Sequence, residues 1–414
     1  MKHYKVFVIW FITIVISAGL FDFLPAVRYG NYAMPIAREK FDTKVYWEGS
    51  DWIKKGEHPY YKHEFNLSTL DYFKEKGQIP YVSESYPLLG IIYFSLPALF
   101  TNNFDVYQAL MFCWNALWLL ILMIGLHNLL ILLNKHWTNL LFLLLPSFLY
   151  FTFNRYDIFP SALVIWSIYY LLISKYNFSL ILLTLGILVK IYPILLLPAY
   201  LLYLKEKDVN WLKYLWLTIS LGTSGLIISI LWSGWWPAII PYIMHWLREE
   251  TGGSFIYSLK SITNNGGFWY IIRPLFKIFT IITPVILTAL LFFKHKFQIT
   301  TGPLNFLKII SITLIMPTIF GFFYSNQWVI WFVPILITVG GWPLLVNTLI
   351  HDILNYLQFP IIGTISSRFY HLSYNWFIYI SLIRSVFLIF ILIILIRSFL
   401  KKITGNEHLG NRQY

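Results

Sequence analysis

Apolar runs of roughly twenty residues recur along the chain and alternate with polar links. Each run can cross about 30 Å of hydrocarbon as a helix, whose backbone polar groups are satisfied within the segment. The first run covers residues 6–23, a long polar stretch follows at 24–85, and the other runs lie within 86–414. This pattern predicts an all-α integral membrane protein, a single polytopic domain over residues 1–414 with about ten to twelve transmembrane helices, counting breaks at prolines.

The charges around the first run set the expected orientation. Lys2 and Lys5 precede it, no clear small-residue cleavage site follows it, and it is longer than the apolar region of an ordinary signal peptide. We therefore expect an uncleaved first helix whose N-terminus lies in the cytoplasm, because lysines favour that side. The 24–85 stretch then becomes a large extracytoplasmic loop.

Lysine-containing clusters between the later runs do not all fit a simple alternation of spans. The clusters at 135–136, 205–207, 294–296 and 401–402 should all prefer the cytoplasm. One or two segments are therefore predicted to be re-entrant or broken. The best candidates are 86–100 and 180–204, of which the second is interrupted at Lys190. If both bend back, Arg155, Asp157 and Lys190 come out on the same face as the large loop.

Composition supports a membrane protein and narrows its partners. The chain is 58% hydrophobic and only 12% charged, whereas soluble domains carry about 25% charged residues. The net charge of +13 comes from short clusters between apolar runs, which suits lipid headgroups and argues against nucleic acid. Because Cys113 is the only cysteine, neither a disulfide framework nor a thiolate metal site can form within one chain.

The large loop holds nine of the 18 carboxylates, and one of them has a setting suited to catalysis. Asp42 lies just beyond the first helix, and Val45 and Tyr46 follow it at a spacing that shares one helical face. Apolar neighbours raise the pKa of a carboxyl toward that of a useful general base. The alternative is that Asp42 is one of several solvated loop acids.

Aromatic and polar side chains that suit a sugar follow in the same loop. Aromatic rings stack on the C–H faces of a sugar, while acids accept hydrogen bonds from its hydroxyls. The substrate-binding candidates here are Tyr46, His58, Tyr60, Glu84 and Tyr86. The alternative is that the aromatic residues form the interfacial belt of a membrane protein.

Three charged residues lie within or between later apolar runs. Arg155 and Asp157 occupy a short polar break, and Lys190 falls inside an apolar run. A charge at the bilayer centre costs about 2.5–3.5 kcal/mol on insertion scales, so each should face the bundle interior, a partner or a cavity. Arg155 and Asp157 are either a structural ion pair or a functional one. For Lys190 a functional role is favoured over snorkelling to an interface.

Two further polar stretches are predicted to face outward. In residues 233–267, His245, Arg248 and Lys260 could bind a phosphate, because Arg makes bidentate contacts and Lys supplies a point charge. The alternative is that Glu249 and Glu250 neutralise these cations. Asn326 and Gln327 form a short polar link between two apolar runs and complete the set of substrate-binding candidates.

Several familiar site patterns are missing from the sequence. No GxxxxGK(S/T) or GxGxxG motif opens a helix, so a nucleotide-binding domain is not indicated. There is no HExxH motif, and His58 with His63 lacks a standard zinc spacing. We therefore expect neither a metal nor a sugar-nucleotide donor.

Five short elements occur in an order that resembles a known group of membrane enzymes. They are Asp42-x-x-Val45-Tyr46, Gly56-Glu57-His58-Pro59-Tyr60, Tyr86-Pro87-Leu88-Leu89, Asn154-Arg155-Tyr156-Asp157 and Leu188-Val189-Lys190-Ile191-Tyr192-Pro193. The set is similar to the polyprenyl-phosphate-mannose-dependent GT-C glycosyltransferases, particularly the bacterial and archaeal mannosyltransferases of family 87. Leu88 stands where that family more often has a second proline, and the C-terminal half offers little that aligns.

The resemblance implies a GT-C-type helical bundle in the cell membrane with an extracytoplasmic active site. It implies an inverting, metal-independent glycosyltransferase that moves a monosaccharide, most often mannose, from a polyprenyl-phosphate carrier to a glycan or glycolipid acceptor. Asp42 is then the catalytic base, and Tyr192 joins the substrate-binding candidates. Lys190, Arg155 and Arg248, with His245 as a weaker candidate, would stabilise the leaving phosphate.

Two other functions fit a chain with many spans. A lipid-linked polysaccharide polymerase or ligase commonly has its large loop late in the chain, whereas here the loop directly follows the first helix. A transporter or flippase of lipid-linked sugars often carries inverted repeats with paired broken helices. The sequence has one interrupted segment, at Lys190, without an evident counterpart in the other half. A glycosyltransferase is therefore the favoured prediction.

Overall fold

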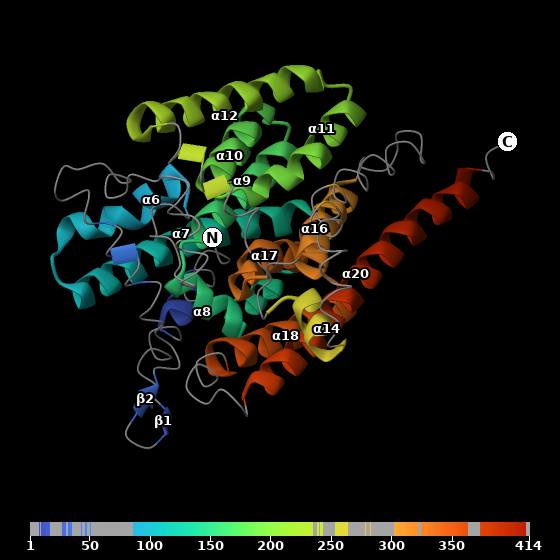
Figure 1. Cartoon of the computed structure of the whole chain (residues 1–414). Coiled ribbons are helices and arrows are strands. Elements are labelled where there is room, and N and C mark those ends of the chain that lie inside the picture. The colour runs from blue at the N-terminus through green and yellow to red at the C-terminus, as the bar shows by residue number, and fades with distance from the viewer. Residues whose placement is uncertain are drawn as a thin grey trace.

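In the computed structural model, the described residues form a bundle of packed helices (Figure 1). These residues are 86–234, 253–263, 302–321, 324–362 and 373–410, with shorter pieces at 8, 10–16, 27–29, 32–34, 43, 46–47, 50, 238–239, 241–242, 278 and 282. The sequence-based expectation of a helical fold is confirmed at this level. One detail differs from an all-α fold, because Val27–Tyr29 (β1) and Tyr32–Met34 (β2) pair as a short antiparallel hairpin.

The helices follow one another through the chain with short links. The first half contains α6 (Leu88–Ser95), η1 (Leu96–Phe100), α7 (Phe104–Leu132), η2 (Trp137–Leu144), α8 (Pro146–Asn154), α9 (Ile158–Leu172), α10 (Tyr176–Val189), η3 (Tyr192–Leu196) and α11 (Leu197–Glu206). The second contains α12 (Trp211–Ser233), α14 (Phe255–Thr263), α16 (Pro303–Phe320), η4 (Asn326–Trp328), α17 (Val329–Val339), α18 (Trp342–Tyr356), η5 (Leu357–Ile362) and α20 (Ser373–Gly410).

Four described helices are long and apolar enough to cross a membrane, judged by length and composition. They are Phe104–Leu132, Trp211–Trp232, Pro303–Phe320 and Asn375–Leu400. Shorter apolar helices lie at Leu88–Phe100, Ile158–Leu172, Tyr176–Val189 and Asn326–Val339. These features support a helical membrane protein. The larger number of ten to twelve spans stays a prediction.

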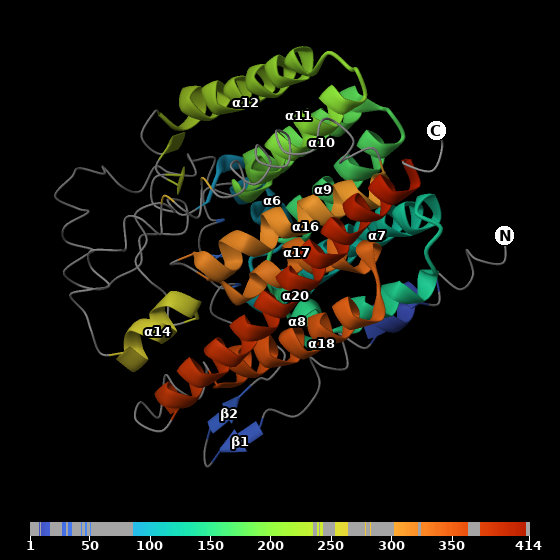
Figure 2. The ribbon, with the colours of Figure 1, turned by 90° about the vertical axis from the view of Figure 1, so that its right-hand side faces the viewer.

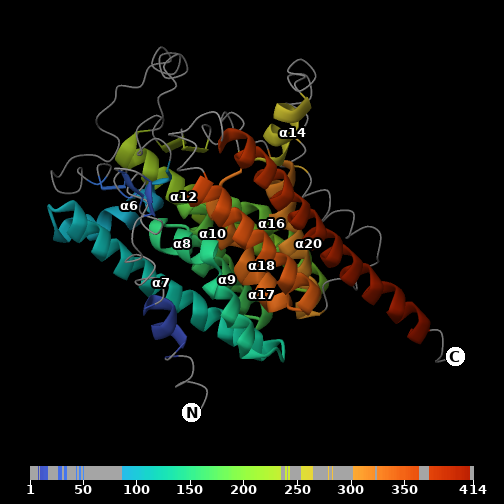
Figure 3. The same cartoon turned by 90° about the horizontal axis from the view of Figure 1, so that it is seen from below.

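Helix α17 lies at the centre of the bundle. Every residue from Val329 to Val339 is buried, and Figure 3 shows α16, α18 and α20 alongside it, in agreement with their contacts. A helix that is apolar on all sides belongs in such a place, since it has no polar face to turn to water. The start of α17 therefore brings its side chains to residues from the first half of the chain.

The predicted interruption at Lys190 is confirmed. Helix α10 ends at Val189, and Lys190 has extended backbone angles of φ −156° and ψ 135°. Pro193 explains the break, because proline has no N–H to donate to the carbonyl four residues earlier, that of Val189. The chain resumes as η3 and α11. The break exposes the Lys190 side chain toward the helix junction described below.

Three helices end with a non-glycine residue in the left-handed region: Asn134 after α7 (φ 52°), Ser174 after α9 (φ 63°) and Asp208 after α11 (φ 55°). After each, the next N–H bonds back to a carbonyl near the helix end, at 2.8, 2.8 and 3.0 Å. This Schellman pattern closes a helix within a tight turn. The lysines at these turns are Lys135, Lys175, Lys205 and Lys207.

These turns share one end of the bundle, here called the lysine face. Figure 2 shows the C-terminal ends of α7, α11 and α20 on its right-hand side and α14 on the opposite side. The C-terminal end of α10 and the α8–α9 junction lie at the end away from the lysine face, since α9 and α10 each run between the two ends. Arg155, Asp157 and Lys190 thus share the predicted common face.

Candidate functional site

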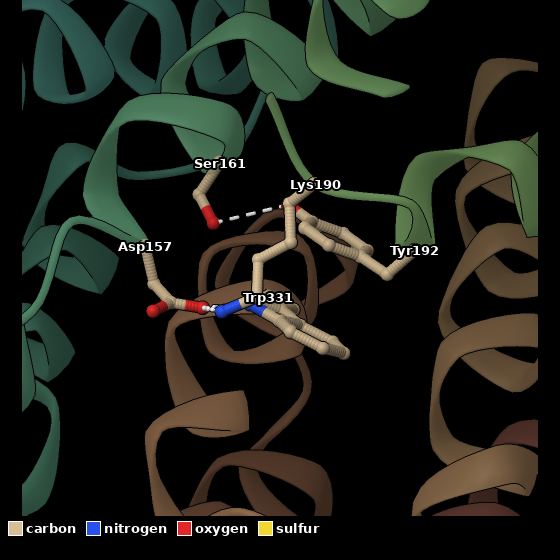
Figure 4. A network of polar contacts seen from close by, with 5 residues as sticks. All are labelled: Asp157, Ser161, Lys190, Tyr192 and Trp331. Carbon is tan, nitrogen blue, oxygen red and sulfur yellow. Dashed lines mark hydrogen bonds and ion pairs between the residues drawn. The ribbon is translucent and has the colours of Figure 1, made fainter. Parts of the chain in front are cut away.

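A buried ion pair joins the α8–α9 junction to the break after α10. The Lys190 ammonium lies 2.6 Å from Oδ1 of Asp157, and the two residues are 5% and 0% exposed. Figure 4 shows the two side chains pointing toward each other from separate helices. A buried charge needs such a partner, because the apolar interior does not solvate it.

Trp331 from α17 binds the same carboxylate. Its indole N–H donates to Oδ1 of Asp157 at 2.7 Å. Its ring stacks on Tyr192, with centroids 4.0 Å apart and planes 5° apart, and the Tyr192 hydroxyl shares a 3.2 Å hydrogen bond with Ser161 (Figure 4). Three segments of the chain therefore fix the position and ionisation of one acid.

Aromatic faces surround the Lys190 ammonium. It lies 4.9 Å from the ring centroid of Tyr156 and 5.3 Å from that of Trp331. Both distances are within the range of cation–π attraction, which is strongest where water is excluded. The pair is therefore a charged site with aromatic walls, which suits a ligand that has both a polar and an apolar part.

Asn115 of α7 holds the junction that carries Asp157. Its side-chain amide donates to the carbonyls of Phe153 and Arg155, each at 3.2 Å, and its oxygen accepts from the Tyr93 hydroxyl at 2.7 Å. Helix α8 ends at Asn154 and leaves these carbonyls without helical partners. A buried amide thus replaces the missing helical hydrogen bonds and keeps the acid in position.

A cluster of rings, here called the aromatic cluster, adjoins the ion pair and consists of Tyr46, Tyr86, Phe94 and Tyr156. Tyr46 stacks on Phe94 with centroids 4.7 Å apart, and it meets Tyr86 and Tyr156 edge-on at 5.8 and 6.0 Å. Tyr86 and Tyr156 are 5.3 Å apart. Tyr156 therefore touches both the Lys190 ammonium and a residue of the large loop.

The segment around Tyr46 is attached to α6 as well. Ser50 donates to the Tyr46 carbonyl at 2.5 Å and makes a longer contact of 3.5 Å with the Phe94 carbonyl. Thr43, Tyr46 and Ser50 are all buried. These residues begin immediately after Asp42, which itself lies outside the described residues. The loop segment that contains the predicted base therefore has buried neighbours beside the ion pair.

Burial raises the pKa of Tyr46 well above its usual range, and Tyr86, Tyr156 and Asp157 add to the effect. The hydroxyl therefore stays protonated at neutral pH. Oδ2 of Asp157 is buried and accepts no hydrogen bond from the described residues. The site thus combines a cation, a carboxylate oxygen with remaining acceptor capacity, and hydroxyl groups, which can bind a phosphorylated sugar.

The structure brings together six of the sequence-predicted residues: Tyr46, Tyr86, Arg155, Asp157, Lys190 and Tyr192. Lys260 lies in α14, and Gln327 lies in η4. Asp42, His58, Tyr60, Glu84, His245 and Arg248 lie outside the described residues. The pairing of Asp157 with Lys190 differs from the expectation that Asp157 would pair with Arg155, and it arises because the chain break turns Lys190 inward.

Asn326 belongs to a second polar group, here called the Arg384 cluster, made of Gly253, Tyr324, Asn326, Asn355, Gln358 and Arg384. Arg384 of α20 donates to Oδ1 of Asn355 at 3.0 Å, to Oε1 of Gln358, and to the Gly253 carbonyl at 2.5 Å. Asn326 donates to Oδ1 of Asn355 at 2.8 Å and to Oε1 of Gln358 at 3.2 Å.

Sequence reasoning missed two residues that these clusters depend on. Trp331 lies within an unbroken apolar run and gives no signal in the sequence. Arg384 is a charge inside an apolar run, so the rule that selected Lys190 could have found it as well.

Comparison with known proteins gives no match to any family model and no match to a curated protein sequence. Conclusions about function therefore depend on the chemistry of the site.

Proposed function

We propose that the protein is an inverting glycosyltransferase that moves a monosaccharide, most often mannose, from a polyprenyl-phosphate carrier to a glycan or glycolipid acceptor. One observation carries the proposal: the buried segment that begins after Asp42 packs through Tyr46 on Tyr156, whose ring is in contact with Lys190. A candidate base and a candidate phosphate-binding cation are thus attached to the same cluster.

The proposed reaction needs only groups of this site and the two substrates. Asp42 accepts the proton of an acceptor hydroxyl while that oxygen attacks C1 of the sugar from the face opposite the phosphate. A new C1–O bond forms, the C1–O bond to phosphate breaks, and the electron pair leaves with the polyprenyl phosphate. Lys190 and Arg155 stabilise the charge that develops on the phosphate.

The lipid-linked donor accounts for the apolar surroundings of the site. A polyprenyl chain is soluble only in the bilayer, so an enzyme that uses it benefits from helices that open sideways to lipid. The proposal therefore includes a cell-membrane location, ten to twelve spans and an active site on the extracytoplasmic face. It includes no metal, because a phosphate monoester leaves readily as an anion when a cation is in place.

Transfer by the purified protein in lipid tests the proposal. The wild type is expected to move mannose from polyprenyl-phosphate-mannose to a glycolipid acceptor. Asp42→Asn is expected to lower the rate by about 10²–10⁴-fold, the usual contribution of a general base. Asp71→Asn, which removes another acid of the same loop, serves as the matched control and should keep its activity.

Two outcomes contradict the proposal in different ways. Transfer that survives in Asp42→Asn removes that residue from its role. Movement of lipid-linked sugar across the bilayer without transfer replaces the enzyme by a flippase, and polymer formation from lipid-linked oligosaccharides replaces it by a polymerase or ligase.

A further inference from the structure

Arg384 is a fully buried cation in the middle of a candidate membrane span. It is 0% exposed and lies in the Asn375–Leu400 span, about 14 Å along the axis from Asn375 at 1.5 Å per residue. A charge at such a depth costs several kcal/mol unless it is paired. It is therefore the most expensive residue of α20 and requires an explanation.

No described carboxylate pairs with Arg384. Its hydrogen-bond acceptors are the Asn355 and Gln358 side-chain amides and the Gly253 carbonyl, all of them neutral. The Tyr324 ring lies 3.6 Å from the guanidinium carbon. Burial raises the pKa of Tyr324 to about 12, so this phenol supplies no negative charge at neutral pH. Within the described residues, the positive charge is not balanced.

Lys190 differs from Arg384 in this respect. Its charge is compensated by Asp157 at 2.6 Å. The two cations are connected by a row of rings, in which Tyr192 stacks on Trp331, Trp331 stacks on Trp328 at 4.8 Å, and Trp328 meets Tyr324 at 5.6 Å. The Arg384 cluster is therefore a separate charged site at the other end of this row.

Two buried donor atoms beside Arg384 have no hydrogen-bond acceptor. They are Nε of Arg384 itself and Nε2 of Gln358, and they belong to two side chains that are hydrogen-bonded to each other. Both atoms are donors and not acceptors. A cation with two remaining N–H donors selects an anion, and the planar guanidinium matches phosphate oxygens.

We propose that the Arg384 cluster binds a phosphate group through the Arg384 guanidinium and the Gln358 amide. The phosphate is either that of a membrane lipid or free inorganic phosphate, since both present the same oxygens. This site is distinct from the Lys190–Asp157 pair, and its existence does not depend on glycosyl transfer. The rival explanation is that Arg384 only clamps Gly253 and η5 to α20.

Gln358→Glu separates these explanations without removing the arginine. The new carboxylate keeps the acceptor oxygen that Arg384 and Asn326 use, and it neutralises the guanidinium. The fold should therefore be retained while phosphate is repelled. Asn347→Asp adds the same charge to α18 near the lysine face and serves as the matched control, because Asn347 lies at the opposite end of that helix.

Binding is measured by native mass spectrometry and thermal shift on the purified full chain in detergent, with undecaprenyl phosphate, undecaprenol and inorganic phosphate as probes. Wild type and Asn347→Asp should bind undecaprenyl phosphate at least about tenfold more tightly than undecaprenol, and Gln358→Glu should lose this preference. Competition by inorganic phosphate identifies free phosphate as sufficient, whereas its failure identifies the lipid as the source.

The proposal is overturned if Gln358→Glu binds undecaprenyl phosphate as tightly as the wild type does. It is also overturned if the wild type has no preference for the phosphorylated lipid, or if Lys190→Gln abolishes the preference while Gln358→Glu keeps it. Arg384→Lys retains the charge but loses the bidentate geometry, so it should weaken binding less than Gln358→Glu.

Discussion

The indole N–H of Trp331 donates a 2.7 Å hydrogen bond to Oδ1 of Asp157, across 174 positions of the sequence. The acceptor belongs to the α8–α9 junction and the donor to the central helix α17. The carboxylate that pairs with Lys190 is therefore completed by the second half of the chain. This contact makes the site a property of the whole bundle and gives the first prediction.

Replacing Trp331 by Phe should destabilise the protein. Phe keeps an aromatic ring against Tyr192 but removes the N–H donor from a buried charged acceptor, a loss of about 1.5–3 kcal/mol. Thermal unfolding in detergent, compared with wild type, measures the effect. Trp376→Phe is the control, since Trp376 is 62% exposed. Equal losses in the two variants would contradict a specific role for the indole N–H.

Removing one partner of the ion pair should cost more than removing both. Asp157→Asn leaves the Lys190 ammonium buried without its carboxylate, which is expected to cost about 3–5 kcal/mol. The double variant Asp157→Asn with Lys190→Met removes the charge as well and should recover part of that loss. Unfolding by heat and by denaturant gives the comparison. A double variant no more stable than Asp157→Asn would show that the pair is not energetically coupled.

Gly90→Ala should disturb the site through the backbone. A Cβ at Gly90 would lie 3.2 Å from the Val189 carbonyl oxygen and 3.3 Å from the Tyr156 ring, so α6 has to move away from the break at Lys190. The expected cost is about 1–3 kcal/mol. At Gly222 the nearest atom to a new Cβ is a Thr184 methyl at 3.9 Å.

Gly222→Ala is thus the matched control for Gly90→Ala. It should be neutral or stabilising by up to about 1 kcal/mol, because alanine favours a helix over glycine. The thermal midpoints of both variants and their transfer rates are to be compared. If Gly90→Ala is as stable and active as Gly222→Ala, the close approach of α6 to Val189 has no importance.

Cysteine labelling tests the orientation of the two ends of the bundle. Cys113 is exposed and is first replaced by Ser. In that background, Lys44→Cys in the large loop should react with an impermeant reagent added outside intact cells. Ser174→Cys, at a turn of the lysine face, should react only after the cytoplasm is opened. The reverse pattern of labelling would invert the proposed topology.

The sequence predicted the parts of the site that depend on local chemistry. A lysine followed by Ile-Tyr-Pro inside an apolar run indicated a helix break, and the structure has it at Lys190. The common face of Arg155, Asp157 and Lys190 followed from the lysine clusters and is confirmed by the 2.6 Å ion pair. The roles of Asp42, His58 and Arg248 stay predictions, because these residues lie outside the described part of the chain.

Other features depend on which helices meet. Nothing in the sequence distinguishes Trp331 from the other tryptophans of apolar runs, and only the central position of α17 brings it to Asp157. Asn355 and Gln358 likewise acquire meaning only because α18 and η5 pack on α20 beside Arg384. Hydropathy measures whether a segment prefers lipid, and it carries no information about which neighbour a polar side chain faces.

By itself, the sequence determined that the chain is a helical membrane protein, where its helices break, and that a few buried charges need partners. The tertiary structure decided who those partners are: Lys190 with Asp157 and Trp331, and Arg384 with neutral amides. The physical reason is that apolar length and proline breaks act within a segment, whereas the pairing of buried charges depends on contacts between helices far apart in the chain.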